Sequence, residues 1–204
     1  MRLVVFGLVL LFAACTLPPV VFHDGLPAQV PGPDRLALRG QMSVMYWSES
    51  DDDPAVVPGF MTLGARMGGD VGPVAVEGGA GLLGVSVPYF HLGVGSSRPA
   101  VMMRGLVFAD GWWQASFLAG PPRRSSGFNW SAGLGASRLG FGPNLVLENR
   151  WGDFTLRGQG SVTWRAPWAD SMVKGSVVSL GLGVEPSIDL KRKATADTTQ
   201  PKPR

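Results

Sequence analysis

The chain has 204 residues, of which 16% are charged and 45% hydrophobic, with 29 glycines and 17 prolines. This length suits one β-rich domain, and so much glycine and proline indicates many strands and tight turns rather than helices. The formal net charge of +3 is small and its basic residues are scattered. Because nucleic-acid binding requires a clustered basic face, no nucleic acid is predicted as a partner.

The first 14 residues carry one charge, Arg2, followed by an uncharged apolar run. A transmembrane helix needs about 20 apolar residues, so this shorter run predicts a signal peptide over 1–14. Cys15, the only cysteine, follows at once, which excludes an intramolecular disulfide. The letters L-F-A-A-C (11–15) resemble the lipobox of bacterial lipoproteins, in which small residues precede an acylated cysteine.

The lipobox resemblance implies that Cys15 becomes the mature N-terminus and carries a covalent acyl anchor, palmitate included. Thr16 stands where an aspartate in that family often retains the protein at the inner membrane, so an outer-membrane destination of the Gram-negative type is permitted. The alternative is an ordinary secretory signal that ends by coincidence at a cysteine.

The mature chain divides into three parts by composition. Residues 15–33 contain five prolines and no regular period, which predicts a lipidated, Pro-rich tether. A period of two begins at Asp34 and predicts a β-barrel domain over 34–188. Residues 189–204 are polar, basic and without aromatic side chains, and we predict a disordered tail.

The clearest strand is predicted over 154–165, where Leu156 and Trp164 share an apolar face opposite Arg157 and Gln159. A second lies near 36–46, and less regular segments are predicted at 59–68, 72–83, 86–95, 100–109, 112–119, 128–139, 144–150 and 172–185. Short turn signals such as Asp110-Gly111 make neighbours antiparallel. The fold class is therefore all-β, an antiparallel up-and-down barrel of about 8–10 strands.

Alternation alone does not say which face of the strands is wet, so composition has to decide. A soluble barrel carries many charged residues on its outer face, whereas three of the four lysines here lie in the tail. The aromatic residues gather near the ends of the predicted strands. The region 34–188 thus resembles small outer-membrane barrels of the OmpA-like or OmpX-like kind. This resemblance implies a bilayer around the strands and a girdle of aromatic residues at each membrane–water interface. The alternative is a lipid-tethered, soluble, lipocalin-like barrel that binds an apolar ligand.

If the polar faces point inward, a set of charged residues lies in the lumen, with Glu77 a further candidate. These lumen charges are Arg39, Arg66, Arg104, Glu148, Arg150, Arg157 and Arg165. In a barrel of this size such charges are expected to form a structural ion-pair network. The sharper alternative is a narrow water-filled path that prefers anions, because arginines outnumber acids.

No enzyme is predicted, and no catalytic residue, cofactor or metal site is assigned. Some outer-membrane barrels modify lipid A with a histidine and a serine, and this remains a weaker alternative that would need His91 to contact a serine and an acid. One cysteine and two distant histidines do not supply a zinc ligand set. Substrate, protein partners and oligomeric state are not predicted.

Overall fold

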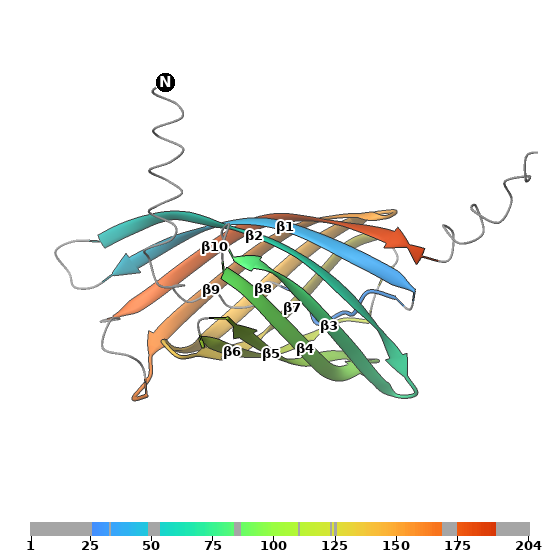
Figure 1. Cartoon of the computed structure of the whole chain (residues 1–204), viewed down its shortest axis with the longest axis horizontal. Helices are drawn as coiled ribbons and strands as arrows, with labels where there is room; N and C mark the ends of the chain where they lie inside the picture. Colours follow the sequence, from blue (N-terminus) through green and yellow to red (C-terminus); the bar gives the residue numbers. More distant parts are fainter. Residues whose placement is uncertain are drawn as a thin grey trace, which may run out of the picture.

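The segments with a period of two form ten antiparallel strands that close into a barrel (Figure 1). A computed structural model describes residues 26–32, 34–48, 54–83, 87–109, 111–122, 124, 126–168 and 175–190. Each strand pairs with its neighbours in the chain, and β1 pairs with β10 to close the sheet. The strands are β1 (Arg35–Ser48), β2 (Pro54–Val71), β3 (Val74–Leu83), β4 (Val87–Ser97), β5 (Ala100–Phe108), β6 (Trp113–Gly120), β7 (Gly127–Ser137), β8 (Gly140–Trp151), β9 (Phe154–Arg165) and β10 (Ser176–Asp189). The predicted antiparallel barrel is confirmed.

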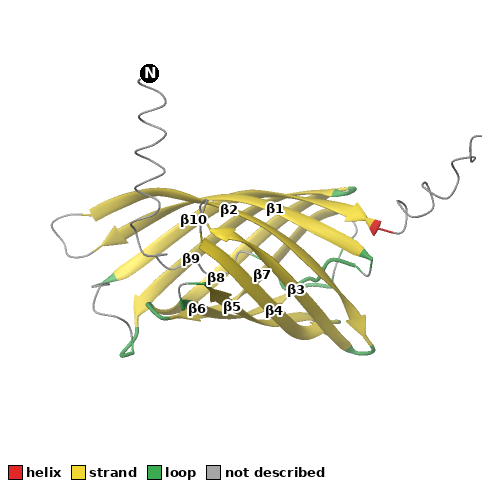
Figure 2. Cartoon of the chain, in the orientation of Figure 1, coloured by secondary structure: helices red, strands yellow, loops and turns green. Residues whose placement is uncertain are grey.

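Most strand boundaries differ from the sequence prediction by a few residues, and two of them are instructive. β2 begins at Pro54, five residues before the predicted strand 59–68, and Pro54 pairs with Ser48 of β1. Proline is accepted at the first residue of a strand, which explains why it did not end the pairing. β10 ends at Asp189, one residue into the predicted tail. Figure 2 shows that the described chain is nearly all strand, and no helix in it has the length and hydropathy of a membrane span.

The barrel has two ends, which we name by the strands that meet there. The near mouth is the end where β1 begins and β10 ends, on the right in Figure 1, and it carries the tight turns 72–73, 98–99 and 152–153. The far mouth is the opposite end, where β9 is joined to β10 by residues 166–175. Because the number of strands is even, the chain enters the barrel (start of β1) and leaves it (end of β10) at the same mouth.

The alternation places polar side chains inside the barrel and apolar side chains outside. On β9, Thr155, Arg157 and Gln159 are buried, whereas Leu156 and Trp164 are 45% and 48% exposed. The same holds along the barrel, where leucines, valines and methionines cover the outer face. A soluble barrel has the reverse arrangement, since water does not solvate such a surface favourably. The barrel therefore has the outer face of a membrane-spanning barrel, and the soluble, lipocalin-like alternative is wrong.

Aromatic side chains form two outward bands, as predicted for a membrane barrel. One band lies toward the far mouth and the other toward the near mouth. The far band contains Tyr46, Phe90, Trp113, Phe141, Trp164 and Trp168, and the near band contains Phe128, Trp130, Trp151 and Phe154. Tyr89 and Phe108 were expected in these girdles but are buried inside the barrel, because they share the inward parity of His91 and Arg104.

Candidate functional site

A short segment of the predicted tether, residues 26–32, lies inside the barrel near the near mouth. We call it the plug. Its residues from Leu26 to Val30 are buried, and Ala28 and Val30 pack against Ala75, Ala100, Met102 and Leu118 of the wall. Figure 1 shows the blue trace of this segment running within the ring of strands. These residues are thus part of the barrel core and not a linker outside it.

The plug is held by hydrogen bonds from the wall to its backbone. Arg104 donates to the carbonyl oxygens of Leu26, at 2.8 Å, and of Pro27, and Arg66 donates to that of Gln29 at 3.1 Å. The Ala28 amide donates to Ser131 Oγ at 3.2 Å. The plug forms no helix or strand, so its backbone carbonyl groups accept hydrogen bonds from the buried guanidinium groups of Arg66 and Arg104 instead.

Charged side chains form a continuous belt around the inner wall above the plug. Its order is Arg104, Glu77, Arg66, Glu185, Arg157, Glu148 and Arg150, which takes in strands β5, β3, β2, β10, β9 and β8. Arg66 and Arg157 each lie 2.8 Å from Glu185, and Arg104 is in direct contact with Glu77. Every side chain in this charge belt is at most 7% exposed. Such an arrangement fixes the barrel wall, since each buried charge is offset by a neighbour of opposite sign.

A second polar layer lies next to the charge belt, toward the far mouth. Arg39 donates to Gln41, which donates to Ser43 Oγ at 3.1 Å and to Gln159 Oε1 at 2.7 Å. The last bond spans from β1 to β9 across β10, where the intervening inward residue is Gly181. A Cβ at that position would collide with the Gln41 amide, so the glycine is needed for this contact.

The sequence-predicted lumen charges divide into two groups. Six of them are buried inside the barrel, namely Arg39, Arg66, Arg104, Glu148, Arg150 and Arg157. Arg165 is exposed at the last residue of β9, at the far mouth, and lies outside the charge belt. Glu185 was missed, although it has the same parity as Ser179 and Gly181 on a strand that otherwise alternates leucine and small residues. Its position on the same face of the strand as these small residues could have identified Glu185 as a lumen residue.

The far part of the lumen is filled by an apolar cluster. Its buried members are Met45, Leu83, Tyr89, Leu106, Phe108, Leu139 and Val177, and Val87 and Trp112 pack against it. Tyr89 and Phe108 lie with their ring centroids 5.8 Å apart. This far cluster, the charge belt and the plug occupy successive levels of the lumen, and their side chains are buried at each level.

His91 lies in the lumen between the charge belt and the far cluster. Its Nε2 atom is 3.8 Å from Glu77 Oε1, and its ring stacks with Tyr89 at 6.4 Å between centroids. Gly79, its partner on β3, leaves the space that the imidazole occupies. Ser97 shares the inward parity of His91 but lies six residues along β4, about 20 Å away. The acidic neighbour of His91, Glu77, is already bound by Arg66 and Arg104. This arrangement favours a structural role for His91 over a catalytic one.

The described residues contain no group of three or more His, Cys, Asp or Glu side chains able to hold a metal ion. Arginines outnumber acids in the lumen, and each belt glutamate is bound by two arginines. The lumen can therefore attract anions and offers no vacant carboxylate to a cation.

No protein-family model and no curated protein sequence matches the chain. Among solved structures, the attachment invasion locus protein Ail of Yersinia pestis is 10% identical, with a TM-score of 0.38 over 76% of this chain and 99% of that one. The NanC porin is 11% identical, with a TM-score of 0.38 over 74% of this chain and 98% of that one. At these values, neither likeness identifies a family or an activity.

Proposed function

We propose that the protein is a lipid-anchored barrel of the bacterial outer membrane that is closed at rest and has a structural role. The observation that carries this proposal is the filled lumen, in which plug, charge belt and far cluster follow one another from mouth to mouth. A barrel that conducted solutes at rest would leave a connected polar space instead. The apolar outer face with its two aromatic bands supports insertion in a bilayer.

The near mouth faces the periplasm in this proposal. Bacterial membrane barrels carry short turns on the periplasmic side, and three of the near-mouth turns have only two residues. Cys15 stands 11 residues before Leu26, which lies in the lumen close to this mouth. A chain of that length reaches at most about 40 Å, so an acyl anchor in the periplasmic leaflet is compatible with a seated plug.

The lipid anchor has a direct chemical test. We expect mature protein from cells fed a labelled palmitate analogue to carry the label, and its N-terminal peptide to begin at an acylated Cys15, because the lipobox resemblance directs cleavage there. The Cys15→Ser variant should carry no label, while Thr16→Ser should be labelled like the wild type. An unmodified Cys15 in the mature protein would contradict the lipid anchor and favour an ordinary secretory signal peptide.

A second candidate function is a narrow, anion-preferring path that opens when the plug leaves. The observation that favours it is the excess of buried arginine: Arg39, Arg66, Arg104, Arg150 and Arg157 face three glutamates, Glu77, Glu148 and Glu185. The wall contacts to the plug named above are hydrogen bonds to its backbone and small apolar contacts, all of which are reversible.

Single-channel recording in planar bilayers separates the two candidates. We expect the wild-type protein to show no steady conductance, because three levels of packing block the lumen. A variant lacking residues 26–32 tests whether the plug is the barrier, and a variant with Ala28→Cys and Ser131→Cys in a Cys15→Ser background holds the plug in place by a disulfide. Steady anion-selective currents in the wild type, absent from the oxidised double-cysteine variant, would contradict the structural proposal and establish the pore.

A further inference from the structure

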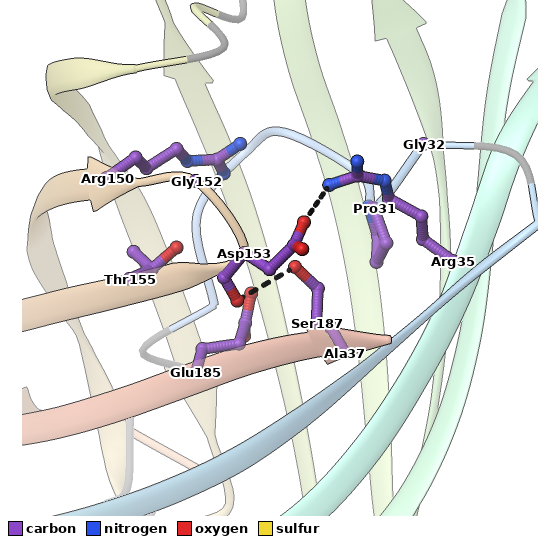
Figure 3. A pocket seen from close by; sticks show the side chains of 10 residues that line it. All are labelled: Pro31, Gly32, Arg35, Ala37, Arg150, Gly152, Asp153, Thr155, Glu185 and Ser187. Atoms are coloured by element: carbon purple, nitrogen blue, oxygen red, sulfur yellow. Dashed lines mark hydrogen bonds and ion pairs between the residues drawn. The ribbon is translucent and has the colours of Figure 1, made fainter. Parts of the chain in front are cut away.

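A polar cavity of about 450 Å³ lies at the near mouth between the plug and the wall formed by β8, β9, β10 and β1 (Figure 3). Pro31 and Gly32 of the plug form one side, and Arg150, Thr155, Glu185 and Ser187 lie on the wall. The cavity has room for a small solute and a few water molecules. Its lining comes from the plug, from the wall and from the turn residues Gly152 and Asp153.

The two acids that line the cavity are already neutralised. Asp153 forms an ion pair with Arg35 at 3.2 Å, drawn as a dashed line in Figure 3. Glu185 accepts hydrogen bonds from Arg66 and Arg157, each with a closest approach of 2.8 Å. A cation would therefore have to displace arginine side chains from both carboxylates, so the cavity is not suited to a metal ion.

The positive charge in the cavity is not neutralised to the same degree. Arg150 ends the charge belt, and its acidic partner is Glu148, at 3.3 Å and 3.4 Å from Nη2. Glu148 is shared with Arg157, so three glutamates serve four arginines along the belt. The Arg150 side chain is 7% exposed, and its buried Nε–H group has no hydrogen-bond partner. A buried, charged donor left unpaired is costly, and the Arg150 side chain to which it belongs lines the cavity.

We infer that this cavity binds a small oxyanion, a carboxylate or a phosphate, with Arg150 as its principal ligand. A planar guanidinium offers Nε–H and Nη–H in the fork geometry that carboxylate and phosphate oxygens accept. The hydroxyl group of Thr155 lines the same space and supplies a further donor, whereas that of Ser187 donates to the Asp153 carbonyl oxygen at 3.2 Å. Figure 3 shows Arg150 and Arg35 reaching toward the cavity from opposite sides; Arg35 is paired with Asp153, so Arg150 supplies the positive charge that favours an anion there.

The bound oxyanion would also tie the plug to the wall, since Pro31 and Gly32 line the cavity opposite Arg150. Binding is thus expected to stabilise the folded barrel in proportion to ligand occupancy. The inference stands on the cavity and on the Arg150 Nε–H group, which has no hydrogen-bond partner, and it holds whether the barrel is closed or conducts after plug release.

The test is thermal unfolding of the full chain in a sugar-headgroup detergent, with inorganic phosphate titrated against sodium chloride of equal ionic strength. We expect phosphate to raise the Tm of the wild type beyond the effect of chloride. Arg150→Gln should weaken phosphate binding by at least about tenfold, because a charge-assisted contact is lost. The matched control is Arg165→Gln, which removes an exposed arginine at the far mouth and should leave binding unchanged.

A second variant and a lipid arm complete the experiment. Arg150→Lys keeps the charge of the belt but lacks the fork, so it should fold like the wild type and bind phosphate more weakly. Phosphatidylglycerol added to the same micelles tests a lipid headgroup as the source of the oxyanion; protection by the lipid but not by free phosphate, lost in Arg150→Gln, assigns the site to a headgroup. Equal responses of wild type and both Arg150 variants, or no response beyond that to chloride, would overturn the inference.

Discussion

Replacing Glu185 by Gln is expected to lower the free energy of unfolding of the barrel by about 3–5 kcal/mol. Glu185 accepts hydrogen bonds from Arg66 at 2.8 Å and 3.2 Å and from Arg157 at 2.8 Å, and it is 4% exposed. Glutamine keeps the shape of the side chain but not its charge, so two buried guanidinium groups lose their common counter-charge. Reversible unfolding by urea in phospholipid vesicles, followed by tryptophan fluorescence, measures the loss.

The matched control for Glu185 is Asp153→Asn, which breaks the pair with Arg35 at the near mouth. There the two side chains are 57% and 36% exposed, and pairs in solvent contribute about 0–1 kcal/mol. Equal losses for the two variants would mean that the charge belt adds nothing beyond an ordinary surface pair, and the structural role given to it would be wrong.

Much of the barrel could be predicted because its sequence repeats every two residues between turn signals. Every predicted strand corresponds to an observed one, and the polar face of β9 is the inward face. The inside and the outside of the barrel were predicted from composition, since a wet outer face needs many charged residues and the predicted strands contain almost no lysine. Strand ends were less accurate, as at Pro54, because a proline at the first residue of a strand resembles a loop.

The interior was harder to predict, because its contacts join residues that closure of the barrel brings together. Arg66 and Glu185 lie 119 positions apart in the chain and meet across β1 only when β10 pairs with it. The plug carries no periodic signal, and its binding groups are backbone carbonyls, which any sequence supplies. Arg66 and Arg104, which bind the plug, were predicted as lumen residues. The sequence did not show that backbone carbonyl groups of the plug would accept their hydrogen bonds.

Replacing Leu182 by Arg is expected to lower the free energy of unfolding in vesicles by about 2–4 kcal/mol, because it places a charge near the middle of the lipid-facing surface. Leu182 is 70% exposed near the centre of β10, between Met42 of β1 and Gly158 of β9. Its matched control is Phe154→Arg, at the near-mouth end of β9, where the interfacial region should limit the loss to about 0–1 kcal/mol. Urea unfolding in vesicles measures both variants, and the same pair in detergent micelles should differ less. A neutral effect of Leu182→Arg in vesicles would mean that this face is in water, which would remove the basis for a membrane-spanning barrel.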